Sequence, residues 1–108
     1  MRKVLLLILF LSLAGVVQAK GNAENGKAKA AQVCAACHGA DGAKPVAPEN
    51  PILAGQYPDY LVKALSDYKA GKRANPIMKA FADQLSKQDI EDLAAWFSSQ
   101  KSNLHFQR

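Results

Sequence analysis

Two cysteines and a histidine stand within one five-residue stretch and are the side chains best able to do chemistry in this chain. They are Cys34, Cys37 and His38, in the pattern Cys-x-x-Cys-His. At this spacing two thiols can form thioether bonds to the vinyl groups of a haem, while the neighbouring imidazole binds its iron. The motif therefore predicts one covalently bound haem c.

Two other kinds of site share part of this pattern: a redox-active cysteine pair and half of a zinc site. A zinc site needs two further ligands, yet the chain has only two cysteines and two histidines, and the second histidine, His105, lies close to the C-terminus. A thioredoxin-like protein needs strands that alternate with helices. We find no β-branched or alternating run that could form them, so we favour haem.

The first residues have the pattern of a secretory signal peptide. Arg2 and Lys3 are followed by an apolar run over residues 4–13, and Val17 to Ala19 offer the small residues of a cleavage site. This pattern predicts a signal peptide over residues 1–19, cut after Ala19, and hence a periplasmic protein without stable membrane insertion after cleavage. A retained membrane anchor is the alternative, although the apolar run is short for a span.

Residues 20–108 are expected to form a single small domain. A chain of this size buries little apolar surface, so a haem would serve as part of its core. The formal net charge is +5, but Arg2 and Lys3 belong to the predicted leader. The remaining basic residues are dispersed and no aromatic residues alternate with them, which argues against nucleic-acid binding.

The pattern of caps, breakers and apolar positions predicts helices joined by loops. Asn22 can cap a first helix that runs toward Cys34, and Gly39 should end it. Residues 40–56 are rich in glycine and proline and are expected to be a loop. Periodic apolar positions predict a helix over 58–70, closed by Gly71, and a last helix over 86–97 that begins with a capping box. The expected fold class is all-α.

Several blocks of sequence, in the same order, resemble a class I c-type cytochrome, and most of all the bacterial cytochrome c4 and c553 group. The blocks are Gly26, Cys34–His38, Pro51–Gln56, Tyr60–Leu61, Lys69–Arg73, Asn75–Met78 and Ile90–Phe97. The resemblance implies a small cytochrome c fold in which the N- and C-terminal helices cross and loops wrap one covalent haem. It departs from cytochrome c4 in one respect, because that protein carries two haem domains and this chain has one haem motif.

The resemblance also implies a role for each site residue. Cys34 and Cys37 would form the thioethers, and His38 would be the proximal iron ligand, with its second ring nitrogen donating to the Pro51 carbonyl. Met78 would be the opposite axial ligand. A lone methionine is ordinarily a flexible core filler. Here Met78 is the only methionine besides Met1 and occupies the position of the family's ligand.

Weaker expectations attach to other residues. A glycine at position 26 would let the first helix approach an aromatic residue of the last helix, and Trp96 would supply it. His105 could compete for the iron, although a histidine in a polar tail is usually solvated. Five basic residues could surround the haem edge and steer an acidic partner, or could simply be solvated. They are Lys44, Lys63, Lys72, Arg73 and Lys79.

These assignments predict an electron carrier and not an enzyme. A histidine and a methionine would occupy both axial positions, and a thioether ligand raises the reduction potential. The partners would be other redox proteins of a respiratory chain, a reductase or dehydrogenase as donor and an oxidase or reductase as acceptor, met through transient docking. Two alternatives stay open: a catalytic or sensing haem protein with an exchangeable sixth ligand, and the haem subunit of a periplasmic dehydrogenase complex.

Overall fold

The computed structural model describes residues 21–102, so the expected signal peptide and His105 lie outside the described residues. Within the described range the chain forms five helices and no strand, which confirms the all-α class. The helices are α1 (Ala23–Val33), α2 (Ala35–His38), α3 (Pro58–Ala70), α4 (Pro76–Ala82) and α5 (Lys87–Ser98). None of them is long and apolar enough to cross a membrane.

The expected caps start and stop the longer helices. The Asn22 side chain accepts a hydrogen bond from the Asn25 N–H at 3.0 Å and begins α1. Gly71 adopts the left-handed conformation that ends α3. At the start of α5, Ser86 and Asp89 exchange hydrogen bonds of 3.0 and 2.9 Å between side chain and backbone. Local signals in the sequence therefore set these three boundaries.

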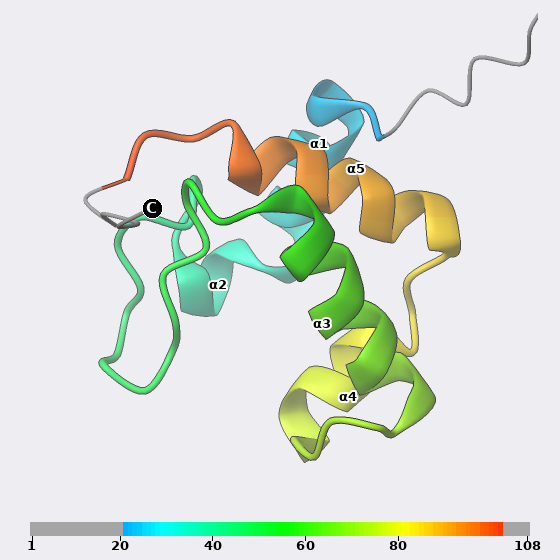
Figure 1. The fold of residues 1–108 in the computed structure, drawn as a ribbon. Coiled ribbons are helices and arrows are strands. Elements are labelled where there is room, and N and C mark those ends of the chain that lie inside the picture. Colours follow the sequence, from blue (N-terminus) through cyan, green and yellow to red (C-terminus); the bar gives the residue numbers. More distant parts are fainter. Residues whose placement is uncertain (1–20, 103–108) are drawn as a thin grey trace, which may run out of the picture.

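Helices α1 and α5 cross in close contact (Figure 1). The approach depends on Gly26, because a Cβ atom at this position would lie 2.0 Å from the carbonyl oxygen of Asp92 and 2.9 Å from Cβ of Trp96. The expectation that Gly26 allows the two helices to pack closely is confirmed. The crossing brings the end of α1, which leads into Cys34, against the C-terminal helix.

Helix α4 was not expected from the sequence, which shows only a short segment around Met78. It has seven residues, too few for an apolar period to be recognised. The signal that marks it is a cap: Asn75 stands at the N-cap and Pro76 at the first helical position, where its missing N–H costs nothing. Met78 therefore lies in the first turn of a helix.

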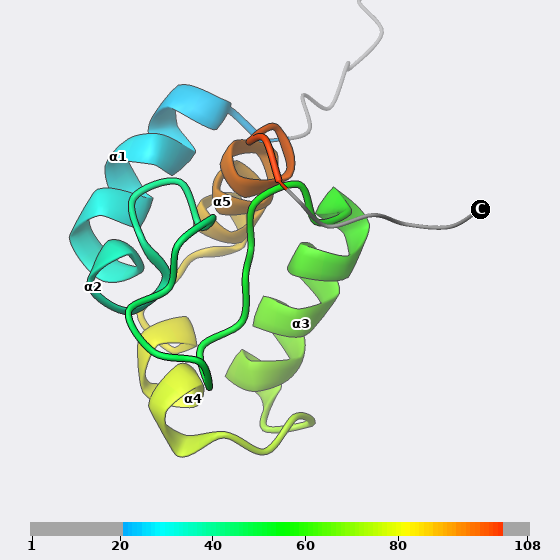
Figure 2. The same cartoon turned by 90° about the vertical axis from the view of Figure 1, so that its left-hand side faces the viewer.

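The buried core is small and is formed by residues of α1, α3 and α5 together with Leu85. Its members are Ala30, Leu61, Leu85, Ile90, Leu93, Ala94 and Phe97, and each of them is buried. Figure 2 shows α1 and α2 on one side, α3 on the other and α4 below, with the loop over residues 40–56 crossing the face between them.

Candidate haem site

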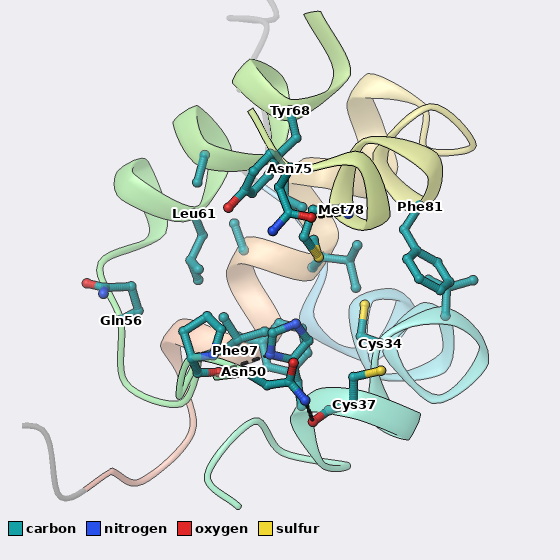
Figure 3. Close-up of a pocket in the computed structure, with 18 of the residues that line it drawn as sticks. Cys34, Cys37, Asn50, Gln56, Leu61, Tyr68, Asn75, Met78, Phe81 and Phe97 are labelled. Atoms are coloured by element: carbon teal, nitrogen blue, oxygen red, sulfur yellow. Dashed lines mark hydrogen bonds between the residues drawn. The ribbon is translucent and has the colours of Figure 1, made fainter. Parts of the chain in front are cut away.

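The haem motif folds as a single helical turn. The His38 N–H donates to the Cys34 carbonyl at 3.0 Å, and α2 ends at Gly39, whose positive φ of 86° suits glycine. Both cysteines are free thiols, and Figure 3 shows their sulfur atoms on the same side of the cavity. Burial raises the pKa of the Cys34 thiol to about 11, so the thiol stays protonated at neutral pH.

His38 is oriented by the loop that follows it. The imidazole is buried, and its Nδ1 atom lies 3.0 Å from the carbonyl oxygen of Pro51. A carbonyl oxygen only accepts, so Nδ1 carries the proton and Nε2 is left with a free lone pair. Asn50 donates to the Cys37 carbonyl at 3.2 Å and holds the same loop against α2. The expected contact between His38 and Pro51 is present, and it selects the tautomer that can bind a metal.

A cavity of about 360 Å³ lies between α2, α3 and α4, within the size range of small-molecule sites. Cys34, Cys37 and His38 line one side, and Met78 enters from α4 with its sulfur directed into the cavity (Figure 3). Most of the remaining lining is apolar. It includes Val33, Leu53, Leu61, Leu65, Leu85, Leu93 and Phe97.

The residues around this cavity fit a haem. An apolar cavity of this size in the centre of a small domain is costly unless a cofactor fills it. Its donors are an imidazole nitrogen with a free lone pair and a thioether, the pair of axial ligands found in cytochromes c, and two free thiols stand beside the imidazole. The structure thus brings together at one cavity the five residues to which the family resemblance assigns a role at the haem: Cys34, Cys37, His38, Pro51 and Met78.

The cavity also contains polar groups whose place the sequence did not reveal. Arg73 donates to the Tyr60 hydroxyl at 3.3 Å, and its guanidinium lies 4.8 Å from the centre of the Tyr68 ring. The hydrogen bond to Tyr60 raises the pKa of Arg73, which keeps the guanidinium charged. The only sequence signal for the two tyrosines is their spacing along α3 with Ala64, which puts the three on one helical face. The sequence predicts for Arg73 only a place among the basic residues around the haem edge.

Two of the candidate docking lysines are engaged with neighbouring carboxylates. Lys63 pairs with Asp67 at 2.6 Å, and Lys79 pairs with Asp83 at 3.0 Å, each on the surface of one helix. Such exposed pairs add little stability, but they lower the net charge that a partner would sense. The structure therefore pairs two of the five candidates, and a basic docking surface stays a prediction.

Known proteins share this fold and this site. The cytochrome c family model matches residues 23–101, and the chain, a c-type cytochrome domain by its helices and its haem motif, belongs to the cytochrome c family. Membership of this family implies a covalently bound haem c, in agreement with the Cys-x-x-Cys-His motif. The expected cytochrome c fold is confirmed.

Among individual proteins the chain is similar to cytochromes c4. It is 51% identical to cytochrome c4 of Pseudomonas aeruginosa over 98 residues, which are 91% of this chain and 48% of that protein. The crystal structure of reduced recombinant cytochrome c4 from Pseudomonas stutzeri matches with a TM-score of 0.70 and 47% identity, over 78% of this chain and 48% of that one. The chain therefore spans about half the length of these cytochromes c4.

A further relative has a different name. The thiosulfate dehydrogenase electron acceptor of Stutzerimonas stutzeri is 42% identical over 72 residues, which are 67% of this chain and 33% of that protein. The family resemblance drawn from the sequence, to the c4 and c553 group, is confirmed by these matches.

Proposed function

We propose that this protein carries single electrons between redox proteins through one haem c. Cys34 and Cys37 would hold the haem by thioether bonds, and His38 and Met78 would be the two axial ligands of its iron. The observation that carries the proposal is that Met78 sulfur and His38 imidazole, forty positions apart in the sequence, line the same apolar cavity, with the His38 tautomer set by Pro51.

Haem iron, when bound, supplies a one-electron redox centre whose potential depends on its axial ligands and surroundings. His38 and Met78 would occupy both axial positions and exclude an external ligand. Apolar side chains of α3 and α5 line the cavity and would exclude water from a bound haem. Covalent attachment by the two cysteines would prevent loss of the cofactor. These roles suit an electron carrier, which needs no place for a substrate and has no catalytic residue.

The proposal also names a cellular compartment, the periplasm, and a class of partner, other redox proteins. Cleavage after Ala19 would release residues 20–108 as one domain into the periplasm, where a dehydrogenase or reductase would donate electrons and an oxidase or another reductase would accept them. Exposed apolar side chains of Ile52, Ile77 and Phe81 line the cavity. A small exposed apolar surface of this kind supports transient docking.

A second candidate is a role as the haem subunit of a dehydrogenase complex. The similarity to a protein named thiosulfate dehydrogenase electron acceptor is the observation in its favour. The two candidates share the same haem chemistry and differ in whether the association is lasting. Co-purification of the chain with a catalytic subunit from its native cells would favour the subunit role, and isolation as a single polypeptide would favour the free carrier.

The Met78→Ala variant tests the axial assignment. We expect loss of the weak far-red absorption of the ferric methionine-bound haem, ready binding of carbon monoxide by the ferrous protein, and a potential lower by a few tenths of a volt, within the ~0.8 V over which axial ligands tune haem. The matched control is Gln84→Ala, an exposed position just after α4 that leaves the cavity lining intact. Persistence of the far-red absorption in Met78→Ala would show that another group binds the iron.

A further inference from the structure

Asn75 lies at the start of the helix that carries Met78 and lines the same cavity. Its side-chain Oδ1 accepts hydrogen bonds from the backbone N–H groups of Ile77 at 3.1 Å and of Met78 at 3.0 Å. Its backbone carbonyl accepts a third bond, from the Lys79 N–H at 2.9 Å. Pro76 has no N–H to satisfy. A single residue therefore satisfies every backbone donor in the first turn of α4.

This concentration of contacts matters because α4 is short. A helix of seven residues has too few internal hydrogen bonds to hold its own first turn. Met78 is in that turn, so the position of its backbone depends on how the turn begins. Figure 3 shows the Asn75 side chain beside Met78, at the point where the sulfur enters the cavity. Removal of Oδ1 would leave the N–H groups of Ile77 and Met78 without this acceptor, and only water could replace it.

We propose that Asn75 is a positioning residue that holds Met78 against the haem iron through the Oδ1 hydrogen bond to the Met78 backbone. The inference rests on the proposed function, because it takes Met78 to be an axial ligand. It adds a residue that touches neither the iron nor the thioethers and that sets how firmly the methionine competes with external ligands. Any side chain that caps α4 in the same way should preserve this property.

The test is a titration of the ferric holoprotein with imidazole, in which loss of the far-red absorption reports that imidazole has replaced the methionine. We compare the wild type with Asn75→Ala, which removes the cap, and Asn75→Ser, which keeps a capping oxygen. We expect Asn75→Ala to bind imidazole about fivefold more tightly. Loss of an N-cap typically shifts the stability of the capped helix by about this factor, and imidazole competes with the methionine that this helix carries. Asn75→Ser should stay within about twofold of the wild type.

The matched control is Ser86→Ala, which removes the N-cap of α5 on a helix that does not carry Met78. It should lower overall stability without tightening imidazole binding. If Asn75→Ala binds imidazole as the wild type does, or if Ser86→Ala binds it as tightly as Asn75→Ala, the positioning role is wrong. If Asn75→Ala does not retain haem, Asn75→Gln takes its place, because the longer side chain keeps the amide but is a poor cap.

Met78→Ala in the same series separates the two claims. If that variant keeps the far-red absorption, Met78 is not the ligand and the proposed function fails together with this inference. If it loses the absorption while Asn75→Ala matches the wild type, the ligand assignment stands and only the role of Asn75 is overturned.

Discussion

The variant in which both Cys34 and Cys37 are replaced by alanine is expected to lose all covalently bound haem. No other cysteine is present to form a thioether. Loss of the haem would leave an apolar cavity of about 360 Å³, and an unfilled cavity of this size costs several kcal/mol, a large part of the stability of a small domain. The measurement is haem staining after denaturing electrophoresis, together with circular dichroism of the purified chain at 222 nm. We expect no stain and a largely unfolded chain.

Each single variant serves as a matched control. Cys34→Ala and Cys37→Ala each leave one thiol beside His38, so each should keep a haem on one thioether, at lower yield. The pattern expected is therefore stain in the wild type, weaker stain in the single variants and none in the double variant. Haem that stays on the double variant under denaturing conditions would show that the attachment does not depend on these cysteines.

Gly26→Ala is expected to destabilise the folded holoprotein by a net amount of about 2 kcal/mol, because the added side chain overpacks the helix crossing. The added Cβ would lie 2.0 Å from the Asp92 carbonyl oxygen, which belongs to the backbone of α5 and cannot rotate away. Helices α1 and α5 would have to separate. Alanine has a higher helix propensity by about 1 kcal/mol, so the net amount of about 2 kcal/mol corresponds to a packing cost of about 3 kcal/mol, at the upper end of the usual range for overpacking. For a domain of this size the melting temperature should fall by roughly 10 °C.

Gly71→Ala separates this contact from the general effect of replacing a glycine. A Cβ at position 71 meets nothing within 4 Å, so only the left-handed conformation resists the substitution, at about 1 kcal/mol. We expect a smaller fall in melting temperature than for Gly26→Ala. A Gly26→Ala protein as stable as the wild type would mean that the helix crossing tolerates a side chain and that the glycine has no packing role.

The parts of the fold that could be predicted from the sequence are those with local signals. Asn22, Gly71 and the pair Ser86 and Asp89 act on backbone groups a few residues away, so the helices that they delimit were expected. Helix α4 was not predicted, because its seven residues are too few to show an apolar period and its only local signal is the Asn75-Pro76 pair. A capping rule applied at Asn75 would have found it.

The candidate site likewise has a part that the sequence predicts and a part that depends on the tertiary fold. The haem motif is contiguous in sequence and its chemistry can be read from residue types alone. The meeting of Met78 with His38 is a tertiary event, and only the family pattern pointed to it. The places of Tyr60, Tyr68 and Arg73 depend on which face of α3 turns toward the cavity and on how the chain folds back after Gly71. The spacing puts Tyr60 and Tyr68 on one face of α3, but composition and spacing do not show how the chain folds back after Gly71 to bring Arg73 to them.

An optical redox titration of the wild-type protein, expressed with export to the periplasm, tests the electron-carrier function most directly. We predict one reversible one-electron transition, a far-red absorption that is present in the ferric form and absent in the ferrous form, and a ferrous spectrum that does not change under carbon monoxide. A ferric spectrum without the far-red absorption, or a ferrous protein that binds carbon monoxide readily, would contradict the assignment of this domain as an electron carrier.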